Sequence, residues 1–593
     1  MKYFQITKLY IIEIIIFFIL FTYLEIISIH KYSKNLTFTY QGEIWADKAG
    51  YYVYLPALFH YHFKLSKFPE NIEYKTGYGF TLDTIHKKVI SKYPIGVALL
   101  EAPFYLVSEL FPDRKEDISG FTTANHLMIR FASVFWLCIG IFFLVRFLKA
   151  KYSITAAILT AGILLFGTNL YYYTIYESGM SHVYSFSMFC VFIYYFHKFK
   201  LTCYTNTKYL IFLSILGAVI ILIRQINIIF IFFTIILNLI TLHGFEKNIS
   251  SLISLKNILI VLTIIIILMI PQLLYYKYAY NNLFSYSYEN EYFIWSHPKI
   301  LKFLFSTNNG MFLYVPLYVI ISFSIIYYIF NHKFKGIIFA CSLLCIIYVF
   351  SSWHCWSYGC SFGQRPTVEY LALFSIPLTS LIYNILIKSK FIIKLSFFSL
   401  LIFIILYNLK LTSVYDKCFY GTSWDWNEYK RYFVKINIFP FIDKYSYFTN
   451  FENEELNRFQ TNPKTIETSN LSYSGIYVSR TDSIMPYSSG FEAQIDNITN
   501  TNLSQVKGTA MCFTKGPIIN GLKLIIEVNS TEGQKILWQS VDINNQIQQD
   551  KWSKIQFDQK INTIVDKYHI LKVYFWNQTG VPVFIDDFFL TVK

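Results

Sequence analysis

The 593-residue chain is 54% hydrophobic and 20% aromatic, with a mean hydropathy of +0.40. This hydrophobic load exceeds that of soluble globular domains and places the chain among membrane proteins. The net charge of +15 does not indicate nucleic-acid binding, because no basic stripe accompanies it and much of the excess falls in short turns between apolar segments.

Apolar runs recur from Ile11 to Leu411, and most can cross a hydrocarbon core of about 30 Å. The first run continues to Ile29 without the small-residue cleavage site of a signal peptide, so we expect a retained first span. The pattern predicts a polytopic α-helical bundle of about eleven spans. The predicted spans are 9–30, 121–146, 153–169, 181–197, 209–223, 226–242, 257–276, 311–330, 336–352, 367–387 and 391–411.

The apolar stretch 209–242 is too long for one helix, and we divide it at Arg224–Gln225. A continuous helix would bury the Arg224 cation in the hydrocarbon core, which is costly. The break instead places Arg224 at the membrane surface.

Short turns rich in lysine and arginine orient the bundle, because such turns face the cytoplasm. These turns are Arg146–Lys151, Lys198–Lys208, Lys247–Lys256, Lys333–Lys335 and Lys388–Lys394. The opposite face collects polar side chains, among them Glu43, Asp47, Glu177, His182, Arg224, His354, Arg365 and Glu369. One polar end on a bundle with nearly uncharged spans favours an enzyme over a transporter, which would place ionisable residues at mid-membrane depth.

The first outer loop, 31–120, holds two semi-apolar segments, 44–63 and 94–111. We expect both to form helices on the outer membrane surface. Counting 94–111 as a span would move the basic turn Arg146–Lys151 to the outside.

Beyond Thr412 the aliphatic runs end and Asn, Thr, Ser and Asp become common. We assign 1–412 to the membrane domain, 413–448 to a connector, and 449–593 to an extracytoplasmic all-β sandwich or jelly roll. The expected strands are 475–479, 490–495, 509–513, 522–528, 554–557, 571–576 and 583–589.

Several short segments in the membrane domain, taken in this order, resemble the GT-C membrane glycosyltransferases, such as protein O-mannosyltransferases and lipid A aminoarabinose transferases. These segments are Asp47–Pro56, Tyr93–Gly96 with Ala102–Phe104, Gly167–Asn169 through Met180–His182, Asn309–Pro316, and Ser361–Pro366. Mannosyltransferases commonly carry an adjacent Asp-Glu pair in the first loop, whereas here Glu43 precedes Asp47 by four residues. In the C-terminal region, 573–577 and 583–588 resemble the closing strands of carbohydrate-binding jelly rolls.

The resemblance implies a multi-pass protein of the bacterial cytoplasmic (inner) membrane with a periplasmic active face. It implies transfer of a sugar from a polyprenyl-phosphate donor to a glycan, lipid or protein acceptor, with inversion and without a nucleotide sugar. No cofactor is assigned with certainty, and a divalent cation is left open. The alternative is a non-enzymatic transporter or scaffold for lipid-linked or surface glycans.

Such transfer needs a base for the acceptor hydroxyl and cations for the leaving phosphate. Asp47 is the expected base, and on a helix Glu43 would share its face. Glu43 as base with Asp47 as its orienter, or Asp47 as a helix cap, are the alternatives. Arg365 and Arg224 are the expected donor-phosphate ligands, since a guanidinium binds phosphate through two parallel hydrogen bonds, whereas the alternative for Arg365 is snorkelling at the interface.

Five further residues at the outer face are candidates for substrate binding: Tyr93, Glu177, His182, Trp353 and His354. The Trp353 ring can stack on a sugar face. Anchoring at the membrane interface explains a tryptophan equally well.

The orientation can be tested with an exported reporter phosphatase fused at two positions. A fusion after residue 412 should be active, because that position is predicted outside, and a fusion after Lys390 should be inactive. The reverse pattern would contradict both the span count and the face assigned to the site.

Overall fold

The computed structural model describes most of the helical region and most of the C-terminal strands. The described residues are 14, 16–29, 42–111, 119–239, 254–288, 291–359, 361–415, 426, 429, 445–449, 451, 462–469, 471–473, 477–495, 498, 503–517, 521–530, 533–563, 565–566 and 568–592. Most of the predicted connector 413–448 lies outside them.

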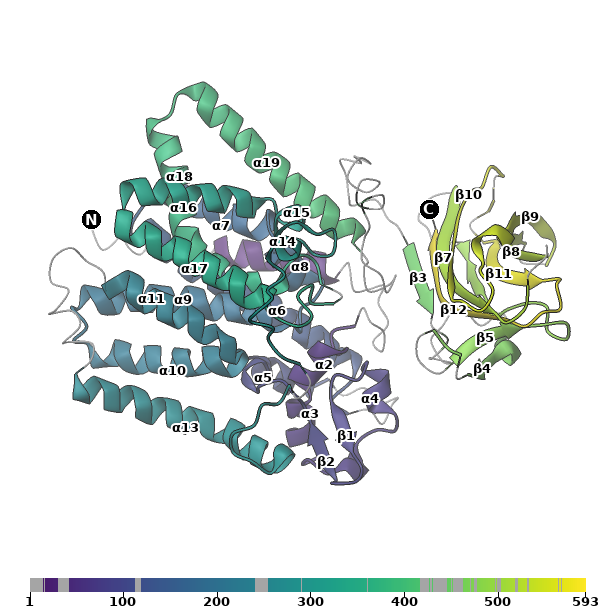
Figure 1. Cartoon of the computed structure of the whole chain (residues 1–593), viewed down its shortest axis with the longest axis horizontal. Helices are drawn as coiled ribbons and strands as arrows, with labels where there is room; N and C mark the ends of the chain where they lie inside the picture. Colours follow the sequence, from purple (N-terminus) through teal and green to yellow (C-terminus); the bar gives the residue numbers. More distant parts are fainter. Residues whose placement is uncertain are drawn as a thin grey trace. The chain divides into compact units, whose positions relative to one another are not determined.

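The chain divides into two compact units, one comprising residues 1–418 and 423–436, the other 419–422 and 437–593. The first unit is helical, and its long helices lie side by side (Figure 1). A helix covers Ile16–Ile29. The labelled helices are α2 Asp47–Tyr52, α3 Tyr54–Phe59, α4 Ile72–Lys75, α5 Gly96–Ser108, α6 Thr123–Lys149, α7 Ile154–Phe166, α8 Leu170–Ile175, α9 Ser181–Leu201, α10 Thr207–Ile223, α11 Ile228–Leu239, α13 Leu255–Tyr280, α14 Ile300–Phe305, α15 Met311–Tyr314, α16 Leu317–Asn331, α17 Lys333–Ser351, α18 Leu371–Lys388 and α19 Phe391–Val414.

Five helices in the described part of the chain, α6, α13, α17, α18 and α19, are long and apolar enough to cross a membrane. Few residues of α13 and α19 are buried by the protein, so their apolar side chains require a lipid environment. Within the described residues, ten of the eleven predicted spans each fall on one helix, and the span 311–330 is divided between α15 and α16. The number of helices that cross the membrane and their orientation stay predictions.

Local chemistry explains where several helices begin and end. Thr122 caps α6 by accepting from the Asn125 amide at 3.3 Å, while the Asn125 side chain accepts from the Thr122 amide at 2.8 Å. Ser153 caps α7 with a single bond, in which its hydroxyl accepts from the Ala156 amide at 3.2 Å. Arg224 adopts an extended conformation between α10 and the 3₁₀ turn Gln225–Asn227, so the predicted break at this residue is confirmed.

The outer loop folds into more elements than the sequence predicted. Segment 44–63 forms the two short helices α2 and α3, and segment 94–111 contains α5. Between them lies an antiparallel hairpin of β1 (Thr81–Asp83) and β2 (Lys88–Ile90), which was not predicted. Hydrogen bonds from this loop to the end of α13, such as that from the Ser91 amide to the Tyr275 hydroxyl at 2.6 Å, fasten it to the bundle.

The second unit is an antiparallel β-sandwich. One sheet has the order β10-β7-β12-β5-β4 with β3 also paired to β12, and the other has the order β6-β11-β8-β9. The strands are β3 Tyr445–Thr449, β4 Ile466–Thr468, β5 Tyr477–Thr481, β6 Phe491–Gln494, β7 Gln505–Thr514, β8 Leu522–Asn529, β9 Lys535–Asp542, β10 Ser553–Lys560, β11 Ile570–Asn577 and β12 Val583–Val592. The sheets pack face to face, with the Phe575 and Phe588 ring centroids 5.2 Å apart.

All seven predicted strands are confirmed, and β3, β4 and β9 are additional. Strand β9 is an edge strand whose residues are exposed or half-buried, so its apolar alternation is weak. Strand β4 has three residues, and β3 lies in the segment assigned to the connector.

Candidate active site

Asp47 is the first residue of α2, and two groups from distant parts of the chain hold its carboxylate. Arg365 Nη2 lies 2.8 Å from Asp47 Oδ2, and the Tyr93 hydroxyl donates to Oδ1 at 2.5 Å. The Asp47 side chain is 31% exposed, so an incoming hydroxyl can reach it. Sequence reasoning selected all three residues, and the structure brings them together.

The backbone around α2 brings Asp47 and Tyr93 together. Ala46 has a left-handed φ of 48°, which turns the chain into the helix, and its amide is held by the Thr76 carbonyl at 2.8 Å. A Cβ on Gly50 would lie 2.4 Å from the Tyr93 ring, so only glycine lets that ring pack against α2. The close approach places the Tyr93 hydroxyl on Asp47.

The electrostatic environment keeps Asp47 ionised. Burial alone would raise the pKa of Asp47, but the Arg365 guanidinium, the Tyr93 hydroxyl and the Lys92 ammonium stabilise the carboxylate. The pKa of Asp47 therefore lies below its usual range. In the free protein Asp47 is a proton acceptor whose charge is already neutralised by Arg365.

Arg365 opens a 3₁₀ turn, Arg365–Thr367, after a left-handed Gly363 with φ of 65°. The preceding segment is fixed by α8 and its N-cap, because the Phe362 amide donates to the Tyr173 hydroxyl at 3.1 Å and the Asn169 side chain donates to the Phe362 carbonyl at 3.1 Å. This scaffold holds the guanidinium 5.9 Å from the centre of the Tyr358 ring.

Arg224 belongs to a second ion cluster on the same side of the bundle. Its Nη1 lies 2.6 Å from Glu369 Oε1, and His182 Nδ1 lies 3.0 Å from Glu369 Oε2. Glu369 is fully buried, whereas the Arg224 side chain is 17% exposed and its guanidinium lies 6.0 Å from the Phe350 ring centre. Glu369, which holds Arg224 and His182, was not among the predicted site residues. Its position just before an apolar run was the signal that could have identified it.

The two arginines lie against neighbouring rings. Phe350, which meets Arg224, and Tyr358, which meets Arg365, have centroids 6.4 Å apart. Both guanidinium groups also act electrostatically on the Tyr51 hydroxyl. Two cations thus face one small region beside Asp47.

Aromatic rings continue from this region toward Trp353. The centroid distances are 4.3 Å from Tyr51 to Tyr93, 6.1 Å from Tyr93 to Tyr288, and 5.9 Å from Tyr288 to Trp353. Lys92 lies over the Tyr93 and Tyr288 rings and pairs with Glu291. Tyr51, Tyr288 and Lys92 were not predicted, since nothing in their spacing distinguishes them from other interfacial residues.

The shared helix face expected for Glu43 and Asp47 is wrong, because α2 begins at Asp47 and the chain turns at Ala46. Glu43 is 3% exposed and faces α6, with its Oε2 3.0 Å from His126 Nδ1 and its Oε1 3.5 Å from Arg130 Nε. It is enclosed and paired away from Asp47.

Glu177 and His354 contact residues other than Asp47. Glu177 Oε2 is 2.9 Å from the buried Lys48 Nζ, which fastens α2 to the loop before α9. His354 stacks on Tyr292 with centroids 5.8 Å apart, and its backbone amide donates to the Tyr292 carbonyl. Within the described residues no group of three or more His, Cys, Asp or Glu side chains is arranged to hold a metal ion.

No family model matches the chain, and no curated protein sequence matches it. Among solved structures, arabinosyltransferase EmbB from Mycobacterium smegmatis is similar, with a TM-score of 0.29 and 10% sequence identity over 81% of this chain and 58% of EmbB. The match thus spans less than two thirds of EmbB.

The Glu369 cluster predicts a large loss of stability when the anion is removed. Glu369→Ala leaves the half-buried Arg224 without its carboxylate partner, so the free energy of unfolding should fall by about 3 kcal/mol, at the lower end of the range for breaking a buried ion pair. Thermal unfolding of the detergent-solubilised chain measures this.

Two further variants complete the test of this cluster. Replacing both charged partners, Glu369→Met with Arg224→Met, should restore much of the loss because no unpaired charge remains. His86→Ala, which removes the exposed partner of Asp83 and leaves the backbone hydrogen bonds of the turn in place, should change the unfolding temperature little. A stable Glu369→Ala variant would show that Arg224 finds another anion or water.

Proposed function

We propose that this chain is an integral-membrane glycosyltransferase of the GT-C type. It transfers a sugar from a polyprenyl-phosphate donor to an acceptor on the outer face of the bacterial cytoplasmic membrane, with inversion of the anomeric centre. The acceptor is a glycan, a lipid or a protein.

The observation that carries the proposal is the convergence of the five segments that resemble GT-C enzymes. Asp47 meets Tyr93 and Arg365. The segment of Arg365 is held by Asn169, and Phe362 packs on Tyr314 with ring centroids 5.6 Å apart. Segments that are far apart in sequence therefore build one polar end of the bundle around an acid and two arginines.

The positive charges of Arg365 and Arg224 complement the negative charge of the proposed donor's phosphate. A polyprenyl phosphate attached to a sugar carries one negative charge in its phosphodiester, and the leaving phosphate gains a second as the glycosidic bond breaks. Preorganised guanidinium groups stabilise such developing charge strongly in a site of low dielectric constant. Arg365 and Arg224 fill this role, with Asp47 and Glu369 fixing their orientation before the donor binds.

The reaction is a single displacement. Asp47 accepts the proton of the acceptor hydroxyl while its oxygen forms a bond to the anomeric carbon. The bond from that carbon to the phosphate oxygen breaks at the same time, and the electron pair leaves with the phosphate. Donor phosphate competes with Asp47 for Arg365, which loosens the ion pair and makes the carboxylate a stronger base.

The rings of Tyr51, Tyr93, Tyr288 and Trp353 extend the site. Their faces can pack on the C–H groups of the transferred sugar or of the acceptor. His182 acts on the donor through Glu369 and Arg224, so we place it as a positioning residue.

The base assignment predicts that Asp47→Asn lowers transfer by at least about a hundredfold. The variant keeps the shape of the side chain and should retain donor binding. Transfer is measured with the full-length chain in nanodiscs, a panel of labelled undecaprenyl-phosphate hexoses and pentoses, and membrane extract as acceptor.

Glu43→Gln is the matched control for this variant. Because Glu43 is enclosed by α6, the substitution should leave transfer within about threefold once the amount of folded protein is equalised. Near-normal transfer by Asp47→Asn with loss in Glu43→Gln would exchange the two roles. Loss of donor binding in Asp47→Asn would make Asp47 a donor ligand.

The pH dependence follows from the lowered pKa of Asp47. The ion pair with Arg365 is present above the ordinary aspartate pKa of about 3.9 and is lost only as the pH falls through the lower folded-state value. We therefore expect kcat/KM to show no fall due to Asp47 between about pH 8 and pH 5. An acid limb within that range that moves in Asp47→Glu would contradict the assignment.

A further inference from the structure

The outer face of the four-stranded sheet in the β-sandwich carries a regular array of side chains. Opposite residues on neighbouring strands point to the same face. The register therefore places Tyr574 beside Ile525 and Ser540, and Trp576 beside Lys523 and Asp542. The intervening residues of β8 and β11 point inward and form the core of the sandwich.

Four aromatic rings form one continuous patch on this outer face. Tyr487 pairs with Trp576 through an isolated bridge, and the two rings stack with centroids 6.0 Å apart. Trp576 meets Trp538 at 6.3 Å, and Tyr487 meets Tyr574 at 5.9 Å. Tyr487 is 45% exposed and Trp538 is 41% exposed, so the patch is open to solvent in this unit. Large exposed aromatic patches mark binding sites.

Hydrogen-bonding groups surround the patch and are fixed in place. The Tyr574 hydroxyl donates to Glu527 Oε2 at 3.0 Å, and the Asn529 amide donates to Glu527 Oε1 at 2.6 Å. The described charged side chains on this face are three lysines and three acids, namely Lys523, Lys535, Lys572, Glu492, Glu527 and Asp542. Several are already paired with each other, such as Lys572 with Glu492 at 3.2 Å. The face is polar but carries no excess of either charge.

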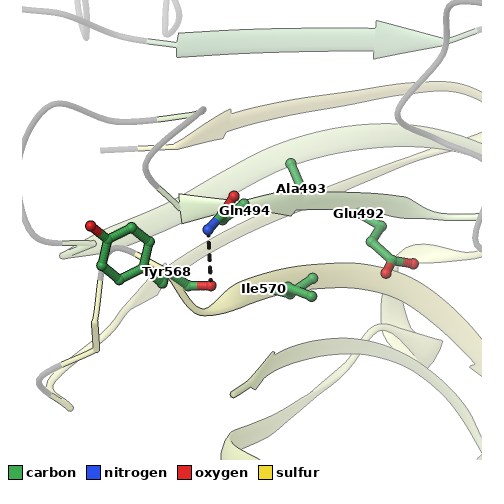
Figure 2. Close-up of a pocket in the computed structure, with 5 residues that line it drawn as sticks. All are labelled: Glu492, Ala493, Gln494, Tyr568 and Ile570. Carbon is green, nitrogen blue, oxygen red and sulfur yellow. Dashed lines mark hydrogen bonds between the residues drawn. The ribbon is translucent and has the colours of Figure 1, made fainter. Parts of the chain in front are cut away.

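A pocket of about 280 Å³ hollows the same side of the sheet. Figure 2 shows its lining, with Glu492 and Gln494 on β6 and Ile570 on the neighbouring β11. The Gln494 amide donates to the Tyr568 carbonyl at 3.3 Å, which fixes the amide at the rim. From Ile570 to Trp576 the strand advances by six residues, or roughly 20 Å. The pocket and the aromatic patch are therefore two ends of one extended surface.

We propose that this surface binds a neutral, linear oligosaccharide. A sugar ring presents C–H groups with partial positive charge on its faces, which the electron-rich face of an aromatic ring attracts, and hydroxyls at its edge, which need donors and acceptors. The surface offers both kinds of group. Its balanced charge gives no advantage to an acidic or a basic ligand, and its length accommodates several sugars and not one.

The binding is separate from the transfer reaction in the helical unit. None of its residues belongs to the site around Asp47, so the proposal stands or fails independently of the proposed function. A peptide that added a strand would use the edges at β6 and β9, because the backbone groups of β8 and β11 are paired within the sheet.

The experiment uses the full-length Asp47→Asn chain in nanodiscs, so that transfer does not consume the ligand. Neutral oligosaccharides of two to eight sugars, from glucan, mannan, galactan and arabinan, are titrated by biolayer interferometry. Affinity for one series should rise with chain length. The double variant Trp538→Ala with Trp576→Ala should weaken that binding by at least about tenfold.

Two controls separate lost stacking from lost folding. Trp538→Phe with Trp576→Phe keeps aromatic rings and should restore most of the affinity. Tyr473→Ala removes a partly exposed ring that packs on Trp552 and lies outside the patch, and it should leave binding unchanged. The proposal is overturned if no neutral series binds, if only acidic glycans bind, or if the double alanine variant binds as well as the parent. Capture of a protein through these rings without glycan binding would assign the surface to a protein partner.

Discussion

The ion pair between Asp47 and Arg365 is the contact on which the polar end of the bundle depends. It joins the first helix of the outer loop to the turn before α18, and neither group has a comparable partner in its own segment. A carboxylate and a guanidinium at 2.8 Å attract strongly where water is partly excluded. The loop can therefore present Asp47 at a fixed place although its elements before α5 have only three to six residues each.

The cluster of Glu369, Arg224 and His182 is also held by a carboxylate–guanidinium ion pair, but its carboxylate is more deeply buried than that of Asp47. Glu369 is fully enclosed and is charged only at the cost of desolvation, which Arg224 and His182 offset together. The break at Arg224 lets its side chain leave the apolar part of α10 and reach this anion. An arginine held in this way loses little conformational freedom when an anionic ligand arrives, and that favours tight and specific binding.

Much of this architecture could be read from the sequence, because the strongest signals are local. Apolar runs gave the long helices their places, and alternation gave seven of the described strands. The charge of Arg224 itself predicted the end of α10, since a charge in the middle of an apolar stretch is costly. Asp47, Tyr93 and Arg365 were selected by their positions in recognisable segments, and they do meet in the structure.

The rest depends on tertiary contacts that no local pattern encodes. The helical face expected for Glu43 and Asp47 failed because Ala46 takes a left-handed conformation, held by Thr76. In the sequence Glu369 is one of several acids assigned to the outer face, and only the structure shows that Arg224 and His182 contact it. Tyr51 and Tyr288 are two of 50 tyrosines in the chain, so composition could not single them out.

The attachment of the outer loop to α13 has a mechanical consequence. Helix α13 packs along α10 but leaves most of its apolar surface uncovered by the protein, and near its C-terminal end it holds the segment that carries Tyr93. Gln272 accepts from the Ile95 amide at 2.8 Å, and the Tyr278 hydroxyl accepts from the Val89 amide at 3.0 Å. A lipid-facing helix changes its tilt when the thickness of the bilayer changes. With α13 crossing the membrane as predicted, the hydroxyl that orients Asp47 is fastened to an element whose tilt responds to the bilayer, and this would couple the geometry of the site to lipid composition.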